Sequence, residues 1–243
     1  MNQSTRYDQK LEHILRTSAR IFAEKSYHST SMRDISRATG VSLAGLYHYC
    51  KSKEELLFLI QDHCFGRVLS RFEQRIKGID DPFVKLRIFI DNHLSFFAAN
   101  MAEMKVLSHE AESLAGDMHK HVSGKKEKYA KQARKILREI QERESEARPR
   151  GQAGSPAEVG RSGRASSVST AATRIDLTVA TYSLFGMMNW IYNWYDSAGK
   201  LSVNQLVDNI TQLFLNGFLS TEKTSLAPGD NVSSEKVNIW RTA

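Results

Sequence analysis

The sequence predicts an all-α protein, and three observations lead to this expectation. Apolar residues recur at the three- and four-residue spacing of a helix along most of the 243-residue chain. Only four prolines interrupt it, and no long run alternates apolar and polar residues as a half-exposed strand would. Hydrophobic residues at 41% and charged residues at 25% are typical of a globular protein, which excludes a disordered or fibrous chain.

The first helix is expected from about Asp8 to Lys25. Its small and apolar residues share one side and predict a buried stripe of Leu11, Ile14, Leu15, Ser18, Ala19 and Phe22. Two short helices follow. Ser31 and Asp34 form a variant capping box at the start of the first, Gly40 ends it, and Ser42 caps the second. Their inner sides are expected to carry Met32, Ile35 and Ala38, then Leu43, Leu46 and Tyr47.

The rest of the chain also shows helical periodicity. Helices are expected at residues 53–76, 83–101, 103–122 with an interruption near Gly116, 125–146, 174–196 and 202–219. Pro82 stands where a first helical turn tolerates proline. Residues 147–173 are rich in Gly, Ser, Ala and Arg, which predicts a flexible, insertion-like loop. Residues 221–243 are polar and are predicted to form a loose tail.

The chain is basic, and its charge is unevenly distributed. It holds 34 Lys and Arg residues against 27 Asp and Glu residues, a net charge of +7. Residues 1–53 hold nine basic against four acidic residues, and residues 120–174 hold fourteen against six. The first region indicates an anionic partner. The second places its charges around an apolar stripe, as a solvated helix face does, although a basic rim could also attract the phosphates of a ligand.

Residues 30–56 carry the strongest functional pattern, two short helices joined by a glycine-containing turn. A helix-turn-helix unit of this kind places the start of its second helix in the major groove of double-stranded DNA. The residues there are small, or offer rings, hydrogen bonds or positive charge: Ser42, Leu43, Ala44, Gly45, Tyr47, His48, Tyr49, Lys51 and Lys53. Spacing alone leaves a second reading, a helical hairpin inside a bundle with a solvated basic face, as in a helical enzyme or interaction protein.

The run LYHYCKSKEEL, Leu46 to Leu56, resembles the end of the DNA-binding domain of TetR-family transcriptional regulators. The upstream run ILRTSARIFAEKSYHSTSMRDISRATGVS, which begins at Ile14, resembles the first two helices of that domain. The resemblance implies an all-α homodimer on a palindromic operator, with a DNA-binding domain at 1–55 and a ligand-binding and dimerisation domain at 56–220. The DNA contacts that it implies are Thr30, Ser31, Arg33, Tyr47, His48, Tyr49 and Lys53. Cys50 stands where the family usually has an aromatic residue.

The second domain concentrates aromatic and methionine residues, which suit a hydrophobic pocket between helices. The candidates are Phe96, Phe97, Met101, Met104, Leu107, Met118, Tyr129, Phe185, Met188 and Trp190. An ordinary core is the alternative reading. The helices at 174–196 and 202–219, the latter with Gly217 in its apolar stripe, are expected to form a four-helix interface with a partner chain, or else to pack within one chain.

Two further stretches point to a branch of the family. HEAESL at 109–114 and FGMMNWIYNWY at 185–195 resemble regulators of fatty-acid and acyl-CoA catabolism. The resemblance implies a repressor that a hydrophobic effector, such as a long-chain acyl-CoA, releases from its operator. Two alternatives stay open: a regulator of drug efflux, sterol or aromatic catabolism, and a thiol-based redox sensor that uses Cys50 and Cys64.

No catalytic residue, cofactor or metal site is expected. His119 and His121 are two residues apart and do not share a helix face. The motifs H-E-x-x-H, G-x-S-x-G and the Walker loop are absent. Two cysteines cannot build a disulfide framework. Without an apolar signal region or an 18-residue apolar run, the chain is expected to be cytoplasmic, with no membrane partner.

Overall fold

The computed structural model describes residues 3–110, 112–147 and 175–219, and within these ranges every regular element is a helix. The elements are α1 (Gln3–Lys25), α2 (Met32–Thr39), α3 (Leu43–Tyr47), α4 (Lys53–Arg75), α5 (Pro82–Ala98), α6 (Met101–His109), α7 (Gly116–Ala147), α8 (Leu177–Asn189), a 3-10 turn (Trp190–Asn193) and α9 (Val203–Leu219). The predicted all-α fold is confirmed. Apart from Ala147, the loop predicted at 147–173 and the tail predicted at 221–243 lie outside the described residues.

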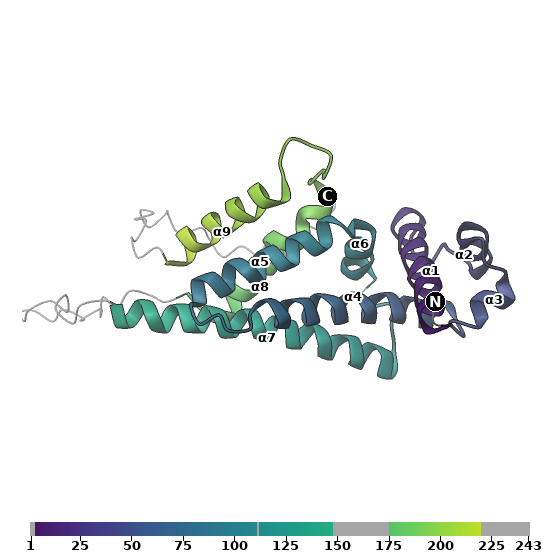
Figure 1. Cartoon of the computed structure of the whole chain (residues 1–243), viewed down its shortest axis with the longest axis horizontal. Helices are drawn as coiled ribbons and strands as arrows, with labels where there is room; N and C mark the ends of the chain where they lie inside the picture. The colour runs from purple at the N-terminus through teal and green to yellow at the C-terminus, as the bar shows by residue number, and fades with distance from the viewer. Residues whose placement is uncertain (1–2, 111, 148–174, 220–243) are drawn as a thin grey trace, which may run out of the picture.

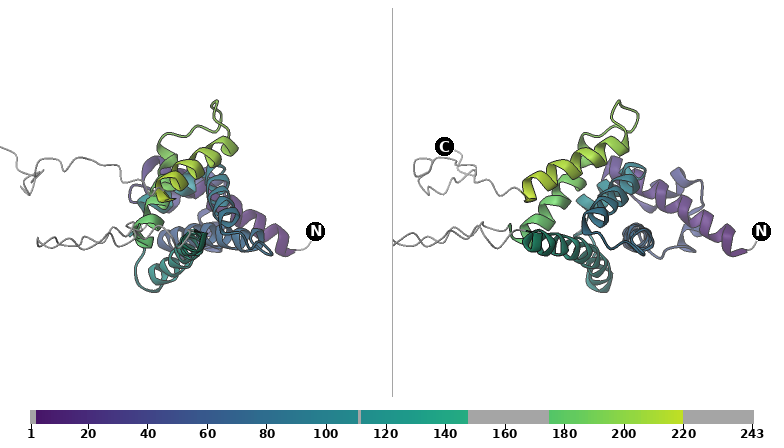
Figure 2. Two further views of the ribbon diagram at one scale, coloured as in Figure 1. Left: turned by 90° about the vertical axis from the view of Figure 1, so that its left-hand side faces the viewer. Right: turned by 60° about the vertical axis from the view of Figure 1, so that its left-hand side comes forward.

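The molecule is elongated, with α1, α2 and α3 together at one end (Figure 1). Helix α4 runs from this end into a larger bundle and packs on α1, α5, α6 and α7. In the bundle α5 lies against α7 and α9, and α8 packs on α7 and α9. The turned views in Figure 2 show α9 on the outer side of the bundle, away from α4. Helix α6 lies between the end that carries the short helices and the end of α8, because it packs on α1 and on the 3-10 turn that follows α8.

We call the end formed by α1, α2 and α3 the small end. The capping residues of its two short helices are those that the sequence predicts. The Ser31 Oγ accepts from the Asp34 backbone N at 3.2 Å, and Asp34 Oδ2 accepts from the Ser31 N at 2.9 Å, which completes the capping box. Gly40 ends α2 with a φ of 65°. Ser42 Oγ accepts from the Gly45 N at 3.1 Å and starts α3. Pro82 stands in the first turn of α5 as predicted, and the structure adds Asp81 as the N-cap of that helix.

The inner faces of the two short helices are narrower than expected. Ile35 and Leu46 are completely buried, whereas Ala38 and Tyr47 are exposed. The expectation that these two side chains pack inward is wrong. Helices α2 and α3 have only eight and five residues, so each presents little more than one buried position per turn.

Three helix limits also differ from the sequence expectation. Helix α1 begins at Gln3 rather than near Asp8. Helix α7 runs unbroken through Gly124, although separate helices at 103–122 and 125–146 are expected, because Val122 and Tyr129 lie on one continuous buried face. Helix α8 ends at Asn189, and the chain tightens into the 3-10 turn before position 196, with the Trp194 N bonded to the Ile191 O at 3.2 Å.

The buried apolar residues form two clusters. The larger one fills the bundle between α4, α5, α7, α8 and α9. The smaller one surrounds α1, α2 and α3 and also contains residues from further along the chain: Leu56, Leu57, Ile60, Val106, Leu114 and Val122. The core beneath the small end is thus completed by side chains of α4, α6, α7 and the α6–α7 loop.

Candidate DNA-binding surface and ligand cavity

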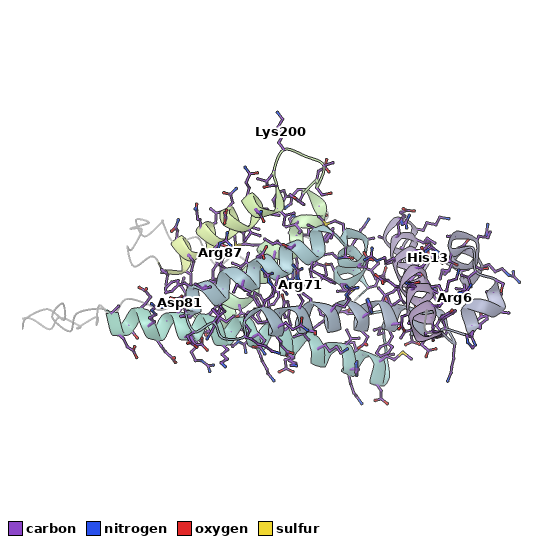
Figure 3. All side chains as sticks on the ribbon, viewed as in Figure 1. Arg6, His13, Arg71, Asp81, Arg87 and Lys200 are labelled. Carbon is purple, nitrogen blue, oxygen red and sulfur yellow. The ribbon has the colours of Figure 1, made fainter. Side chains whose placement is uncertain are left out.

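The short helices present an exposed polar surface at the end of the molecule. Ser31 and Arg33 are exposed at the start of α2, and Ser42, Ala44, Tyr47 and His48 are exposed on or next to α3; Leu43, Gly45 and Tyr49 are half-buried. Arg6 and His13 of α1 lie at this same end (Figure 3). The His13 Nε2 lies 3.1 Å from the Thr39 O, which ties α1 to the end of α2. The Tyr49 ring stacks on Tyr7 at 4.8 Å between centroids.

Gly45 sits in a tight position within α3. A Cβ at this residue would lie 3.0 Å from Val41 Cγ1 and 3.1 Å from the Ser42 Oγ. The second atom is the capping hydroxyl that accepts from the Gly45 N. The glycine therefore lets the capping turn close against the start of α3.

Thr30 and Lys53 do not face outward with the other predicted DNA-contacting residues. Thr30 is 2% exposed, and its hydroxyl donates to the Ser26 O at 2.8 Å. The Lys53 Nζ donates to the Tyr27 O at 2.8 Å and the Thr30 O at 2.9 Å, and it lies 4.4 Å from the centroid of the Tyr27 ring. Both side chains are engaged within the α1–α2 loop. Their placement does not favour the predicted DNA contact, because these groups already have partners inside the protein.

The two cysteine thiols are buried in different core clusters, Cys50 beneath α3 and Cys64 in the bundle. Burial raises the pKa of Cys50 to about 11 and that of Cys64 to about 12. A buried, protonated thiol is a poor nucleophile, since the thiolate is the reactive form. Neither the placement nor the ionisation of these cysteines favours the redox alternative.

A cavity of about 490 Å³ lies between α5, α6, α7 and α8. Six of the predicted pocket residues line it: Phe97, Met104, Leu107, Tyr129, Phe185 and Trp190. Four do not. Phe96 lines a different cavity, Met101 packs against the bundle core, Met188 is completely buried in that core, and Met118 lies about two turns of α7 before the lining residues.

The cavity also has lining residues that the sequence analysis missed: Phe65, His93, Ser108, Lys126, Ala130, Tyr182, Gly186, Asn189 and Tyr192. Met and aromatic content does not distinguish His93, Ser108, Lys126 or Asn189 from other polar residues. His93 carries a usable signal, because it stands four residues before the predicted pocket residue Phe97 and shares its helix face. Lys126 and Tyr129 carry another, since they are three residues apart and share a helix face.

Burial dominates the ionisation of the groups around this cavity. His93 is 3% exposed, and burial lowers its pKa to about 3, so the imidazole is neutral near pH 7. Burial raises the pKa of Tyr129 and lowers that of Lys126. The Lys126 Nζ lies 5.5 Å from the centroid of the Phe65 ring. The cavity is therefore mainly aromatic, with neutral polar groups and one lysine.

A second cavity of about 560 Å³ is more polar and lies between α1, α4, α5 and α6. Its wall includes Glu12, Arg16, Arg67, Arg71 and Glu103, and Figure 3 shows Arg71 at the middle of the molecule. Glu12 Oε1 pairs with Arg16 at 3.2 Å and with Arg67 at 3.5 Å. Burial raises the pKa of Glu103. Ion pairs of the protein thus occupy part of this wall.

The end of α6 is hydrogen-bonded to the loop that precedes α2. The Glu110 Oε1 accepts from the Tyr27 backbone N at 3.3 Å, and the Glu110 O accepts from the Gln61 Nε2 at 3.1 Å. Nearby, Glu54 Oε1 accepts from the Ala115 N at 3.2 Å. Helix α6 also carries Leu107 and Ser108 of the 490 Å³ cavity. One short helix therefore touches both the cavity and the loop beneath the exposed surface.

Large apolar side chains are exposed on α8, on the turn after it and on α9: Val179, Tyr182, Trp190, Trp194 and Leu213. Trp190 and Leu213 are 60% and 67% exposed. Among the described residues, no group of three or more His, Cys, Asp or Glu side chains is placed to hold a metal ion. No helix in those same ranges is both long and apolar enough to cross a membrane.

Two family models match the chain. The model for bacterial regulatory proteins of the TetR family matches residues 14–60. The model for a tetracycline-repressor-like C-terminal domain matches residues 80–152 and 163–218, which is more than half of the chain.

Individual proteins give the same picture. The chain is 29% identical over 91 residues to the fatty acid metabolism regulator protein of Bacillus subtilis, a match that covers 37% of this chain and 47% of the relative. The matched segments span less than half the length of the first curated relatives. The structure of AibR in complex with isovaleryl coenzyme A and operator DNA is 25% identical, with a TM-score of 0.66, and the match covers 84% of this chain and 97% of AibR.

A TetR-family regulator from Bordetella parapertussis is 27% identical, with a TM-score of 0.68 over 86% of this chain and 95% of that protein. One family model matches the helix-turn-helix end, and the other matches the helical bundle. Both lead to one assignment. The chain belongs to the TetR family of bacterial regulatory proteins.

Proposed function

We propose that the protein is a homodimeric transcriptional repressor that binds a palindromic operator and is released from it by an acyl-CoA. The observation that carries this proposal is the combination, in one TetR-family chain, of an exposed α2–α3 surface and a separate aromatic cavity. AibR, which shares the fold along most of both chains, binds isovaleryl coenzyme A and operator DNA. The chain acts on DNA in the cytoplasm and has no catalytic role of its own.

The proposed DNA contacts are the residues that face outward around α2 and α3. Ser42, Leu43, Ala44 and Gly45 form the narrow start of α3 and meet the base edges, together with Tyr47, His48 and Tyr49. Ser31 and Arg33 contact the phosphate backbone from the start of α2. Thr30 and Lys53 are left out because their side chains hold the α1–α2 loop.

The proposed dimer forms through α8 and α9. Their exposed apolar side chains would be costly to leave in water, and an isologous interface buries each of them against the same helices of the second copy. This arrangement sets the two small ends far apart. It matches half-sites about 34–36 Å apart, or a multiple of this spacing.

We place the boundary between the DNA-binding part and the rest at residues 55 and 56, in the first turn of α4.

Release follows if the effector favours a position of α6 that DNA does not. The effector contacts Leu107 and Ser108 on α6, and Glu110 at the end of α6 holds the Tyr27 backbone before α2. A shift of α6 therefore changes the position of the DNA-binding end relative to the bundle. The effector binds the two conformations, the one that fits DNA and the one that does not, with different affinities. The size of this difference sets how far the effector lowers the affinity for the operator.

The test has two steps. Genome-wide mapping of bound sites supplies the natural operator, and fluorescence anisotropy of that duplex with the purified chain gives its affinity. We expect the logarithm of the affinity to fall linearly with the logarithm of the salt concentration, with a slope of roughly −0.9 per phosphate contact. Failure to bind any palindromic duplex would refute the proposal.

A series of acyl-CoAs of increasing length is then screened for thermal stabilisation and for release of the duplex. Stabilisation by a ligand at a hundred times its dissociation constant amounts to about 2.7 kcal/mol, which a melting curve detects readily. A dependence on chain length supports the acyl effector. A flat response to acyl-CoAs, with release by a sterol or an aromatic compound, assigns the cavity to that class instead.

A further inference from the structure

Lys126 is a cation on the wall of the aromatic cavity that has no acidic partner. The residues that line this cavity, all of them within the described ranges, include one lysine and no Asp, Glu or Arg. The buried polar groups nearby are paired within the protein, because the side chain of Asn189 is hydrogen-bonded to His93 and that of Asn92 to Tyr129. Lys126 is therefore the charged group that this wall leaves without a counter-ion.

Two neighbouring lysines of the same helix have the partner that Lys126 lacks. Lys125 pairs with Asp62 of α4, and the Lys128 Nζ lies 2.7 Å from an oxygen of Glu73, also in α4. Neither of these lysines lines the cavity. Helix α7 thus satisfies its lysines where it faces acidic residues of α4, and it presents an unpaired lysine where it faces the cavity.

The surroundings of Lys126 destabilise its charge. The side chain is half-buried, and burial is the one cause that lowers its pKa, with no acidic group opposing it. The Lys126 Nζ lies 5.5 Å from the centroid of the Phe65 ring. An aromatic ring attracts an ammonium group but does not neutralise its charge. An anion that enters the cavity therefore meets a cation that has lost part of its hydration and gained no counter-charge in return.

The rest of the cavity suits an apolar chain. Met104 and Leu107 are buried on one side of it, whereas Tyr182 and Trp190 are 59% and 60% exposed on another. An apolar chain gains free energy by leaving water for the buried side. An anionic group gains none there, because a buried charge without a partner is strongly unfavourable, and it is stabilised beside the ammonium of Lys126. The cavity therefore fits a molecule with an apolar chain and an anionic end.

We propose that the effector is an amphipathic anion and that Lys126 is the residue that pairs with its charge. The inference rests on the proposed function and deepens it, since Lys126 selects charged over neutral ligands. Under that function the anion is a phosphate of the coenzyme A carrier. The carboxylate of a free fatty acid offers the same chemistry, and the probes below separate the two. Uncharged sterols and aromatic compounds lack the group that the lysine pairs with.

The test is isothermal titration of the full-length chain with three probes that share one acyl chain. Dodecanoyl-CoA carries phosphates, dodecanoate carries a carboxylate, and S-dodecanoyl-N-acetylcysteamine is a neutral thioester. We expect Lys126→Met to weaken dodecanoyl-CoA by about tenfold, because a charged hydrogen bond is lost, and to leave the neutral thioester unchanged. Lys126→Arg keeps the charge and should restore most of the affinity. Lys128→Met is the control, since Lys128 does not line the cavity.

The melting temperature of the ligand-free protein separates a binding role from a structural one. Lys126→Met should not lower it, because the removed charge has no acidic partner in the protein. An unaltered affinity of Lys126→Met for both anionic probes overturns the inference. It is overturned as well if the neutral thioester weakens by the same factor as the anionic probes, because the loss would then come from packing and not from charge.

Failure of the proposed function has a different signature. It shows as a wild-type chain that binds no operator duplex, or one that dodecanoyl-CoA does not release. If dodecanoyl-CoA does not bind while Lys126→Met weakens dodecanoate, the lysine keeps its role and the acyl-CoA effector is wrong. If dodecanoyl-CoA releases the duplex from the wild type and from Lys126→Met at the same concentration, the function stands and the inference alone fails.

Discussion

Lys53 has the sequence signature of a DNA contact, but in the structure its side chain holds the loop before α2. Its position in the run KSKEEL and its charge match the expectation from sequence. The carbonyls that it binds belong to Tyr27 and Thr30, which are 26 and 23 residues away. Periodicity and local motifs carry no information on contacts at that distance. The caps at Ser31 and Ser42 were predictable for the opposite reason, because a cap bonds to a backbone group three residues away.

Replacement of Lys53 by methionine tests this role. Lys53→Met keeps the stem of the side chain and removes the donor from two carbonyls, so we expect the free energy of unfolding to fall by about 1–3 kcal/mol. Chemical denaturation measures this change. Lys51→Met is the control, because Lys51 is exposed, and we expect a change within about 0.5 kcal/mol. Wild-type stability together with a salt slope reduced by about 0.9 would instead make Lys53 a phosphate contact.

Among the elements, α7 departs most from the sequence expectation. Glycine lowers helix propensity, so Ser123 and Gly124 resemble a break between two shorter helices. The buried face of α7 continues across them, and packing on α4 and α5 outweighs the local preference. Helices α2 and α3 were predictable because Ser31, Gly40 and Ser42 mark their ends. The polar residues of the cavity, such as His93 and Lys126, were not predictable, because Met and aromatic content does not single them out.

The same substitution at two glycines should therefore have opposite effects. Gly124→Ala adds a methyl group in open space within a helix, and we expect stabilisation by about 0.5–1 kcal/mol. Gly40→Ala places a Cβ on a residue with a φ of 65°, and we expect destabilisation by roughly 1 kcal/mol. Thermal melts of both variants measure the difference, about 2–4 °C for each kcal/mol. Destabilisation by Gly124→Ala would show that α7 is interrupted.

At the scale of the whole molecule, α8 and α9 leave an apolar surface that the proposed dimer covers. Leu213→Glu places a charge on this surface, and in a two-fold interface each copy contributes one. We expect the dissociation constant of the dimer to rise at least roughly a hundredfold, because a buried unpaired charge costs several kcal/mol. Analytical ultracentrifugation measures this change. Val84→Glu, on an exposed apolar residue of α5, serves as the control; equal dimerisation of both variants would reject the α8–α9 interface.

The contact between Glu110 and Tyr27 gives the route from cavity to DNA a specific test. Glu110→Ala removes the acceptor of the Tyr27 N–H. We expect the ratio of operator affinities without and with dodecanoyl-CoA to fall by the equivalent of about 0.5–2 kcal/mol. Anisotropy titrations measure the ratio, and exposed Glu112→Ala on the same loop is the control. An unchanged ratio in Glu110→Ala would place the coupling elsewhere.

The shared core beneath α1, α2 and α3 limits how this protein can be recombined with its relatives. Val106, Leu114 and Val122 pack against the DNA-binding end but belong to the part that carries the ligand cavity. A chimera joined within α4 would place another regulator's side chains against Ile14, Leu46 and their neighbours, leaving holes or clashes. A functional exchange of operator specificity must therefore transplant those three positions together with the first 55 residues. The end that carries α1, α2 and α3 therefore does not have a self-contained core.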